Sequence, residues 1–164
     1  MQVICVGTFG AAWAINAAME ILSAYLGLFG AAFVAATLLP AQSELLLAGL
    51  VASGDHSLAL LIGFATAGNV LGSAVNWALG RYCNHLSNRR WFPIKKPALA
   101  RAEKWYHRFG RWSLVLSWAP VIGDPLTLLA GILREPLPSF LLIVGVAKLG
   151  RYLVVAGVAL GLVG

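Results

Sequence analysis

The strongest constraint on this chain is a run of residues, 57–80, that contains no charged side chain. A transmembrane helix needs about 20 predominantly apolar residues to cross the hydrocarbon core of a bilayer. Two further apolar runs, 21–39 and 139–163, are of similar length. Over the whole chain 60% of residues are hydrophobic and 11% are charged, whereas soluble domains have about 45–50% and about 25%. The sequence therefore predicts an all-α integral membrane protein.

Basic residues are concentrated in one segment between two of these runs. Residues 81–112 include nine lysines or arginines and one acid, a net charge of +8, whereas the rest of the chain holds three basic residues and five acids, a net charge of −2. Nucleic-acid binding is a poor explanation, because the apolar runs leave no soluble domain to present the patch. Loops rich in Lys and Arg stay on the cytoplasmic side of a membrane, so segment 81–111 is predicted to be cytoplasmic.

Part of this basic segment has helical periodicity. Leu99, Ala102, Tyr106 and Phe109 fall on one face, and basic residues repeat with the same spacing on another. Such a helix is suited to the membrane surface, with its apolar side in the bilayer and its basic side against anionic lipid headgroups. Packing of the apolar side against the rest of the protein is the alternative.

The usual residues of metal sites and catalytic centres form no pattern. Cys5 and Cys83 belong to no CxxC motif or Cys/His cluster, and the three histidines are scattered. The sequence thus predicts neither a metal site nor a cofactor. It contains no recognisable pair of nucleophile and base, so it does not point to an enzyme.

The first 18 residues are apolar and uncharged. A signal peptide would begin with basic residues, and this segment has none. Two interpretations stay open: Met19 is the native start and residues 1–18 are a dispensable extension, or residues 1–18 form an additional apolar helix. Residues 19–164 are predicted to form a single membrane domain.

One short motif occurs twice. LLPAQSELLLAG contains Pro40 and Glu44, and APVIGDPLTLLAG contains Pro120 and Asp124. In both copies the acid follows the proline by four residues and a leucine-rich run then closes in Ala-Gly. Proline breaks the helical hydrogen-bond ladder, so each copy can mark the tip of a hairpin that enters and leaves the membrane on one side. The alternative is that the prolines merely kink ordinary helices.

Two inverted repeats follow from the hairpin interpretation. Each repeat is a re-entrant helix hairpin followed by a transmembrane helix, with the boundaries 21–53 and 57–80 in the first repeat and 112–134 and 139–163 in the second. The basic segment joins the two repeats on the cytoplasmic side, and both chain ends lie on the opposite side. The hairpin tips then meet near the middle of the membrane, as in transporters whose broken helices build a central site.

Four ionisable residues lie in apolar surroundings: Glu44, Asp124, Lys148 and Arg151. A lone charge in the middle of a bilayer costs from about 2.5 to above 10 kcal/mol, depending on the method. Because Lys148 and Arg151 are one helical turn apart, we expect them to face the two acids at the hairpin tips. The pairing can be purely structural, or one acid can take up a proton, or one base can bind an anionic group.

Small and polar residues repeat along the run 57–80. Glycine or asparagine recurs every four residues, at Gly68, Gly72, Asn76 and Gly80, which allows close helix contact. Gly157 and Gly161 form a second, weaker signal of this kind. Asn69 and Asn76, with Ser43 from the first hairpin, are candidates for lining a polar pathway past the ionisable residues.

Four motifs follow one another along the chain: TLLPAQSELLLAGL, GNVLGSAVNWALGR, LSWAPVIGDPLTLLAG and AKLGRY. In these motifs and their order the chain resembles the YqaA-type branch of the DedA superfamily of membrane proteins. This superfamily is also described by the VTT domain and as SNARE-associated-like. The resemblance covers about residues 19–157 and implies a bacterial inner-membrane protein with two facing re-entrant hairpins. It also implies lipid movement across the bilayer, in some members of undecaprenyl phosphate or phosphatidylethanolamine, with dependence on the proton gradient.

The second hairpin departs from the pattern of larger DedA proteins, which usually carry arginines flanking the proline. Three residues before and after Pro120 this chain has Ser117 and Gly123. The anion-binding arginines are thus missing there, which puts a lipid-phosphate substrate in question. Lys148 and Arg151 are the candidates to replace them.

The leading functional prediction is a small transporter or lipid flippase that moves a polyprenyl phosphate or a phospholipid, with proton uptake at Glu44 or Asp124. Transport of an ion or small solute on the same scaffold is one alternative, and a non-transporting role in membrane homeostasis is another. The partners expected are membrane lipids rather than nucleic acid. The sequence leaves open whether the protein is a homo-oligomer.

Overall fold

The computed structural model describes residues 4–36, 42–82, 104, 106, 108–119 and 123–163, with side chains described from residue 15 onward except at Arg111 and Val163. Within these ranges the chain forms helices and no strand, as predicted. The helices are α1 (Ile4–Ala35), α2 (Gln42–Ser53), α3 (Leu58–Tyr82), the 3₁₀ helix η2 (Gly110–Trp118), α5 (Gly123–Ile132) and α6 (Leu137–Val163). Pro40 and Pro120, the predicted hairpin tips, and most of the basic segment lie outside the described residues.

Three of these helices are long and apolar enough to cross a membrane: the part of α1 from Ile15 to Ala35, all of α3, and α6 as far as Leu162. The predicted spans 57–80 and 139–163 therefore correspond to α3 and α6. At 1.5 Å per residue, α2 with 12 residues and α5 with 10 residues are about 18 Å and about 15 Å long. Neither can cross a hydrocarbon core of about 30 Å by itself.

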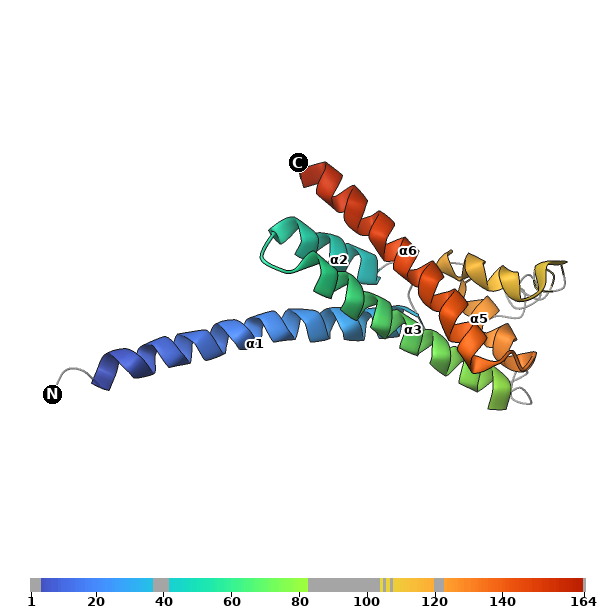
Figure 1. The fold of residues 1–164 in the computed structure, drawn as a ribbon, viewed down its shortest axis with the longest axis horizontal. Coiled ribbons are helices and arrows are strands. Elements are labelled where there is room, and N and C mark those ends of the chain that lie inside the picture. The colour runs from blue at the N-terminus through green and yellow to red at the C-terminus, as the bar shows by residue number, and fades with distance from the viewer. Residues whose placement is uncertain are drawn as a thin grey trace.

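α1 passes through Met19 without a break, so the residues from Ile4 onward continue one helix rather than forming a separate one. The reason is local, because the sequence has no proline before Pro40 and nothing else interrupts the helical ladder. The N-terminal part of α1 extends well beyond the other helices (Figure 1).

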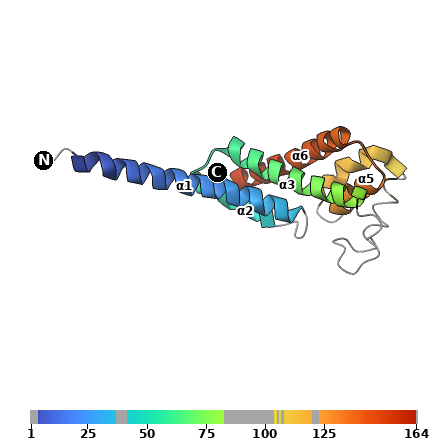
Figure 2. The same cartoon turned by 90° about the horizontal axis from the view of Figure 1, so that it is seen from below.

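α3 lies in the middle of the bundle and contacts α1, α5 and α6. α2 turns back beside α1, and α3 then runs past both toward the end where η2 and α5 lie (Figures 1 and 2). The chain reverses between α2 and α3 at Gly54, whose φ of 74° lies in the left-handed region that glycine tolerates. α6 returns across the bundle and contacts α2, α3 and η2.

The glycines of α3 allow the close contacts that their spacing predicts. A Cβ at Gly68 or Gly72 would overlap the backbone of α1, and a Cβ at Gly80 would overlap the backbone of α5. By contrast, a Cβ at Gly157 or Gly161 on α6 would meet nothing within 4 Å in the described part of the chain. The glycines of α3 thus allow other helices to pack closely against it, whereas Gly157 and Gly161 make no such contact in the described part of the chain.

Two clusters of buried side chains stabilise the bundle. One joins α1, α2, α3 and α6 around Leu28, Leu47 and Tyr152. The other joins α3, η2, α5 and α6 around Leu114 and Phe140. α6 contributes to both clusters, and between its two contributions it carries Lys148 and Arg151. The charged residues of α6 thus lie at the boundary between the two apolar clusters.

Candidate functional site

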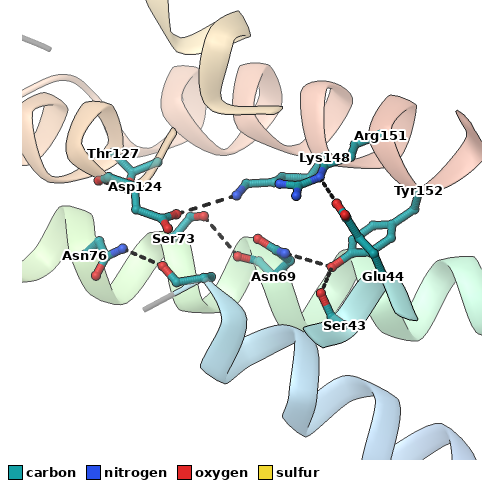
Figure 3. A network of polar contacts seen from close by, with 11 residues as sticks. Ser43, Glu44, Asn69, Ser73, Asn76, Asp124, Thr127, Lys148, Arg151 and Tyr152 are labelled. Atoms are coloured by element: carbon teal, nitrogen blue, oxygen red, sulfur yellow. Dashed lines mark hydrogen bonds and ion pairs between the residues drawn. The ribbon is translucent and has the colours of Figure 1, made fainter. Parts of the chain in front are cut away.

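The candidate site is built on one face of α6, where Lys148 and Arg151 lie one turn apart (Figure 3). Their side chains are almost fully buried, with 3% and 10% of their surface exposed. A buried base needs a partner, because an isolated charge away from water is costly. Both bases have an acid partner from a different short helix.

Arg151 forms an ion pair with Glu44 through its Nε and the Oε1 atom of the carboxylate. Glu44 lies in the first turn of α2, so the pair joins α2 to α6. A charge-assisted hydrogen bond of this kind is stronger than a neutral one. The Glu44 side chain is 26% exposed, so the carboxylate, rather than the guanidinium, is the accessible side of the pair.

Lys148 forms the second pair with Asp124, with 3.8 Å between Nζ and Oδ1. Asp124 lies in the first turn of α5, so this pair joins α5 to α6. The distance is longer than that of a charge-assisted hydrogen bond between such groups. The structure therefore brings together the four ionisable residues singled out in the sequence, as two pairs on consecutive turns of α6.

Each acid lies at the N-terminal end of a short helix. Helix N-termini carry a partial positive charge and favour negatively charged groups. In the structure the first turn of each helix contains an acid of the chain itself, Glu44 in α2 and Asp124 in α5.

Tyr152 is a part of the site that the sequence analysis missed. Its side chain is fully buried and its hydroxyl accepts a hydrogen bond of 2.7 Å from the Nδ2 atom of Asn69. A second contact of 3.1 Å joins it to the Ser43 hydroxyl, in which either oxygen can donate. Tyr152 thereby connects α2, α3 and α6 beside the two ion pairs (Figure 3). The available signal was its position four residues after Lys148, which places both on one helix face.

The other predicted polar residues divide into two groups. Asn69 and Ser43 belong to the site through Tyr152. Asn76 instead donates its Nδ2 hydrogen bond to the carbonyl of Ala36, at 2.9 Å, and so satisfies a carbonyl at the end of α1 that has no partner within the helix. Ser73, a further buried polar residue of α3, donates to the backbone carbonyl of Asn69, at 3.0 Å.

The two positions at which larger DedA proteins carry arginines are closed by packing. Ser117 is fully buried, and a Cβ at Gly123 would overlap the backbone of Ser117. Any side chain at position 123 would need a different local backbone, and an arginine at position 117 would displace the groups packed around Ser117. Lys148 and Arg151 are instead the basic groups that the structure brings to the two acids.

A second polar cluster that the sequence analysis missed lies where α5 turns into α6. Tyr106 donates to the Oε2 atom of Glu135, at 2.7 Å, and Trp77 donates from Nε1 to the Glu135 carbonyl, at 3.1 Å. The guanidinium of Arg81 lies 5.1 Å from the centre of the Trp77 ring. The contact between Tyr106 and Glu135 agrees with the alternative interpretation of the basic segment, in which the apolar side of that segment packs against the rest of the protein.

No cluster of three or more His, Cys, Asp or Glu side chains that could hold a metal ion occurs among the described residues. The chemistry of the site is therefore that of two acids, two bases and neutral hydrogen-bonding groups. Such a site can exchange protons and bind charged groups.

Comparison with known proteins is consistent with this architecture. The model of the VTT domain matches residues 39–159. The chain is 38% identical over 139 residues to the inner membrane protein YqaA of Escherichia coli, and the aligned residues cover 84% of this chain and 91% of that protein. The inner membrane protein YqaA of Shigella flexneri has the same identity and coverage. An uncharacterized protein of Haemophilus influenzae is 33% identical over 135 residues, covering 76% of this chain and 80% of its own. No solved structure matches the chain. The chain therefore belongs to the VTT-domain family, the DedA family of membrane proteins.

Proposed function

We propose that this protein moves a phospholipid or a polyprenyl phosphate across the bacterial inner membrane, through the site formed by the two ion pairs. One observation supports the proposal above all: two short helices, each with an acid in its first turn, meet a long apolar helix at two basic residues that lie one turn apart. The location rests on the relatives named inner membrane proteins and on the three apolar helices.

The burial of the ion pairs supports transport over a purely structural role. A buried ion pair is often no more stable than well-packed apolar residues of similar size. Ionisable residues inside membranes are rare and mark substrate or proton pathways. Four such residues at the boundary of two apolar clusters are therefore better explained by function than by stability.

The proposed cycle uses a proton to change the partner of a base. When Glu44 or Asp124 takes up a proton, its carboxylate becomes neutral, and the attraction to Arg151 or Lys148 weakens. The base then binds the phosphate of a lipid headgroup instead. Release of the proton on the other side of the membrane restores the ion pair and expels the headgroup. Asn69 and Ser43 line this pathway, and Asn76 holds the end of α1 beside it.

The proposed architecture is a pair of inverted repeats, each a helix hairpin followed by a long helix, with the hairpins formed by α1 and α2 and by η2 and α5 and with tips at Pro40 and Pro120. The two hairpins are unequal, because α1 is long enough to cross the membrane by itself. Three observations support this architecture: α2 and α5 are too short to span, each has an acid in its first turn, and the two acids pair with the same helix. Irregular backbone at membrane depth is tolerated when protein buries it. We place the basic segment 81–111 in the cytoplasm, against anionic headgroups.

A reconstitution experiment tests the proposal. Purified protein in vesicles of phosphatidylethanolamine and phosphatidylglycerol is assayed for movement of fluorescent lipid between leaflets, with and without a pH gradient. We expect the wild type to exceed empty vesicles, and Glu44→Gln and Asp124→Asn to reduce the rate about tenfold or more. Glu20→Gln, an exposed acid on α1, is the matched control and should retain the rate.

Three outcomes would separate the alternatives. Movement of ions or small solutes without lipid movement would replace the proposal by the second transport function. An absence of any movement would leave a non-transporting role. A cysteine at Gln42, where α2 begins, should also react with a water-soluble reagent from at least one side of the membrane, and a completely unreactive cysteine would argue against every transport function.

A further inference from the structure

A groove of about 250 Å³ lies between α2 and α6. Leu45 and Ala48 line it on the α2 side, and Val154, Val158 and Leu162 are among the residues lining it on α6. Glu44 is the one charged residue among the lining residues. The groove is thus apolar along most of its length, and one end of it lies at the Glu44–Arg151 ion pair of the candidate site.

The groove runs along α6 for a distance close to half the thickness of the hydrocarbon core. From Val154 to Leu162 α6 rises about 12 Å at 1.5 Å per residue, whereas half of a hydrocarbon core of about 30 Å is about 15 Å. Val154 and Val158 are 61% and 58% exposed, so the groove is open along its side. A chain can therefore enter it from the bilayer without passing through the protein interior.

The two ends of the groove require different chemistry from an occupant. An apolar cavity excludes water and takes up apolar groups, which suits a hydrocarbon chain. The Glu44 carboxylate is paired with Arg151 but is still 26% exposed, so it can accept a hydrogen bond from a polar headgroup. A molecule that meets both requirements is an amphiphile with its polar group at one end of a single chain.

We propose that the α2–α6 groove binds one hydrocarbon chain of a membrane lipid whose headgroup lies at Glu44 and Arg151. The inference rests on the proposed function, because the same ion pair forms its central site. It adds that the lipid enters laterally, between α2 and α6, and that the chain runs from the ion pair toward the end of α6.

The molecule contains an internal control for this inference. A second groove of about 270 Å³ lies between α1 and α3 and is lined by Phe29, Ala59, Leu60, Gly63, Phe64 and Ala67. None of these residues is charged, so this groove offers a lipid chain no site for a headgroup. Lipid should occupy it without a fixed orientation.

Photoreactive lipids test the orientation directly. The full chain is reconstituted in vesicles of phosphatidylethanolamine and phosphatidylglycerol that contain a phospholipid with a diazirine on one chain, either next to the headgroup or at the chain end. Labelled peptides are then mapped by mass spectrometry. We expect the headgroup-proximal diazirine to label Leu45 and Val154, and the terminal diazirine to label Leu162. The α1–α3 groove should show no such order.

Blocking the groove gives a second test with a matched control. Val158→Trp fills the groove from its exposed rim, and Val154→Trp does so nearer to Glu44. Val146→Trp replaces an equally exposed valine of α6 that does not line the groove. We expect both groove variants to reduce labelling of Leu45 and Leu162 several-fold, and the control to leave it unchanged.

Two results would overturn the inference. One is labelling of equal strength all around α6, including the exposed Leu142 and Leu149, which is the result expected for bulk lipid. The other is the reversed order of labels along the groove. Lipid movement measured on the same vesicles separates this inference from the proposed function. Lipid movement together with unordered labelling would rule out the groove site alone. Ordered labelling without lipid movement would rule out the transport function and leave the lipid-binding site standing.

Discussion

Arg151 on α6 and Glu44 in the first turn of α2 form an ion pair that joins the last long helix to a helix of 12 residues. Because α2 is too short to span a membrane, its position depends on contacts of this kind. The pair has both a structural and a functional aspect, and the two can be separated by comparing stability with transport.

Removal of either partner alone should destabilise the protein more than removal of both. Glu44→Gln leaves the Arg151 guanidinium without its carboxylate, and Arg151→Gln leaves the carboxylate without its base. We expect each to lower the free energy of unfolding by roughly 1–3 kcal/mol, below the loss for a completely buried pair because Glu44 is partly exposed. The measurement is thermal unfolding in detergent. If the losses in the double variant simply add, the two residues are not coupled.

Asp124→Asn should destabilise the protein more than Lys148→Met. Lys148 is 3% exposed and Asp124 is 19% exposed, so an unpaired lysine is further from water than an unpaired aspartate. Methionine also retains most of the volume of the lysine side chain and needs no partner. Unfolding curves of the two variants in the same detergent provide the comparison. The opposite order would mean that the Asp124 carboxylate is the less well solvated member of the pair.

Tyr152→Phe should weaken the site while leaving its apolar packing intact. The change removes the hydroxyl that contacts Asn69 and Ser43, and a buried donor left without a partner costs about 1–3 kcal/mol. We also expect lipid movement to fall in Tyr152→Phe by more than the loss of folded protein accounts for, because the hydroxyl holds α2 and α3 beside the ion pairs. Tyr82→Phe, at a tyrosine that is 71% exposed, is the control. Equal effects at both positions would contradict this role of Tyr152.

The sequence predicted the helical class, two of the long spans and the acids and bases of the site. These features follow from composition and from the cost of a charge in an apolar run, which restricts the partners of Glu44, Asp124, Lys148 and Arg151 to one another. The role of Tyr152 was not predictable in this way. A tyrosine hydroxyl is tolerated in many surroundings, and its partners here come from two other helices, so they depend on the packing of three elements.

Local geometry was predicted less well than the class. The segment after Gly110, expected as an ordinary apolar piece of a hairpin, forms the 3₁₀ helix η2, and Gly110 itself has a φ of 58°. Asn76 stays a predicted pathway residue, and its hydrogen bond to the end of α1 was not expected. The partner of Asn76 is a backbone carbonyl of a separate segment, which residue spacing does not reveal.

The two sets of glycines should respond oppositely to the same substitution. At Gly72 a Cβ would come within 2.6 Å of the Phe33 carbonyl oxygen, and at Gly131 it would overlap the backbone of Trp77. Backbone cannot yield as a flexible side chain can, so Gly72→Ala and Gly131→Ala should each cost at least about 1–3 kcal/mol, the usual loss from overpacking. Gly157→Ala and Gly161→Ala meet nothing within 4 Å in the described part of the chain and should be neutral or slightly stabilising, because alanine favours a helix by about 1 kcal/mol. Thermal unfolding of the four variants in detergent measures both effects. A loss of stability at Gly157 or Gly161 that appears only at high protein concentration would show instead that this face of α6 binds another helix.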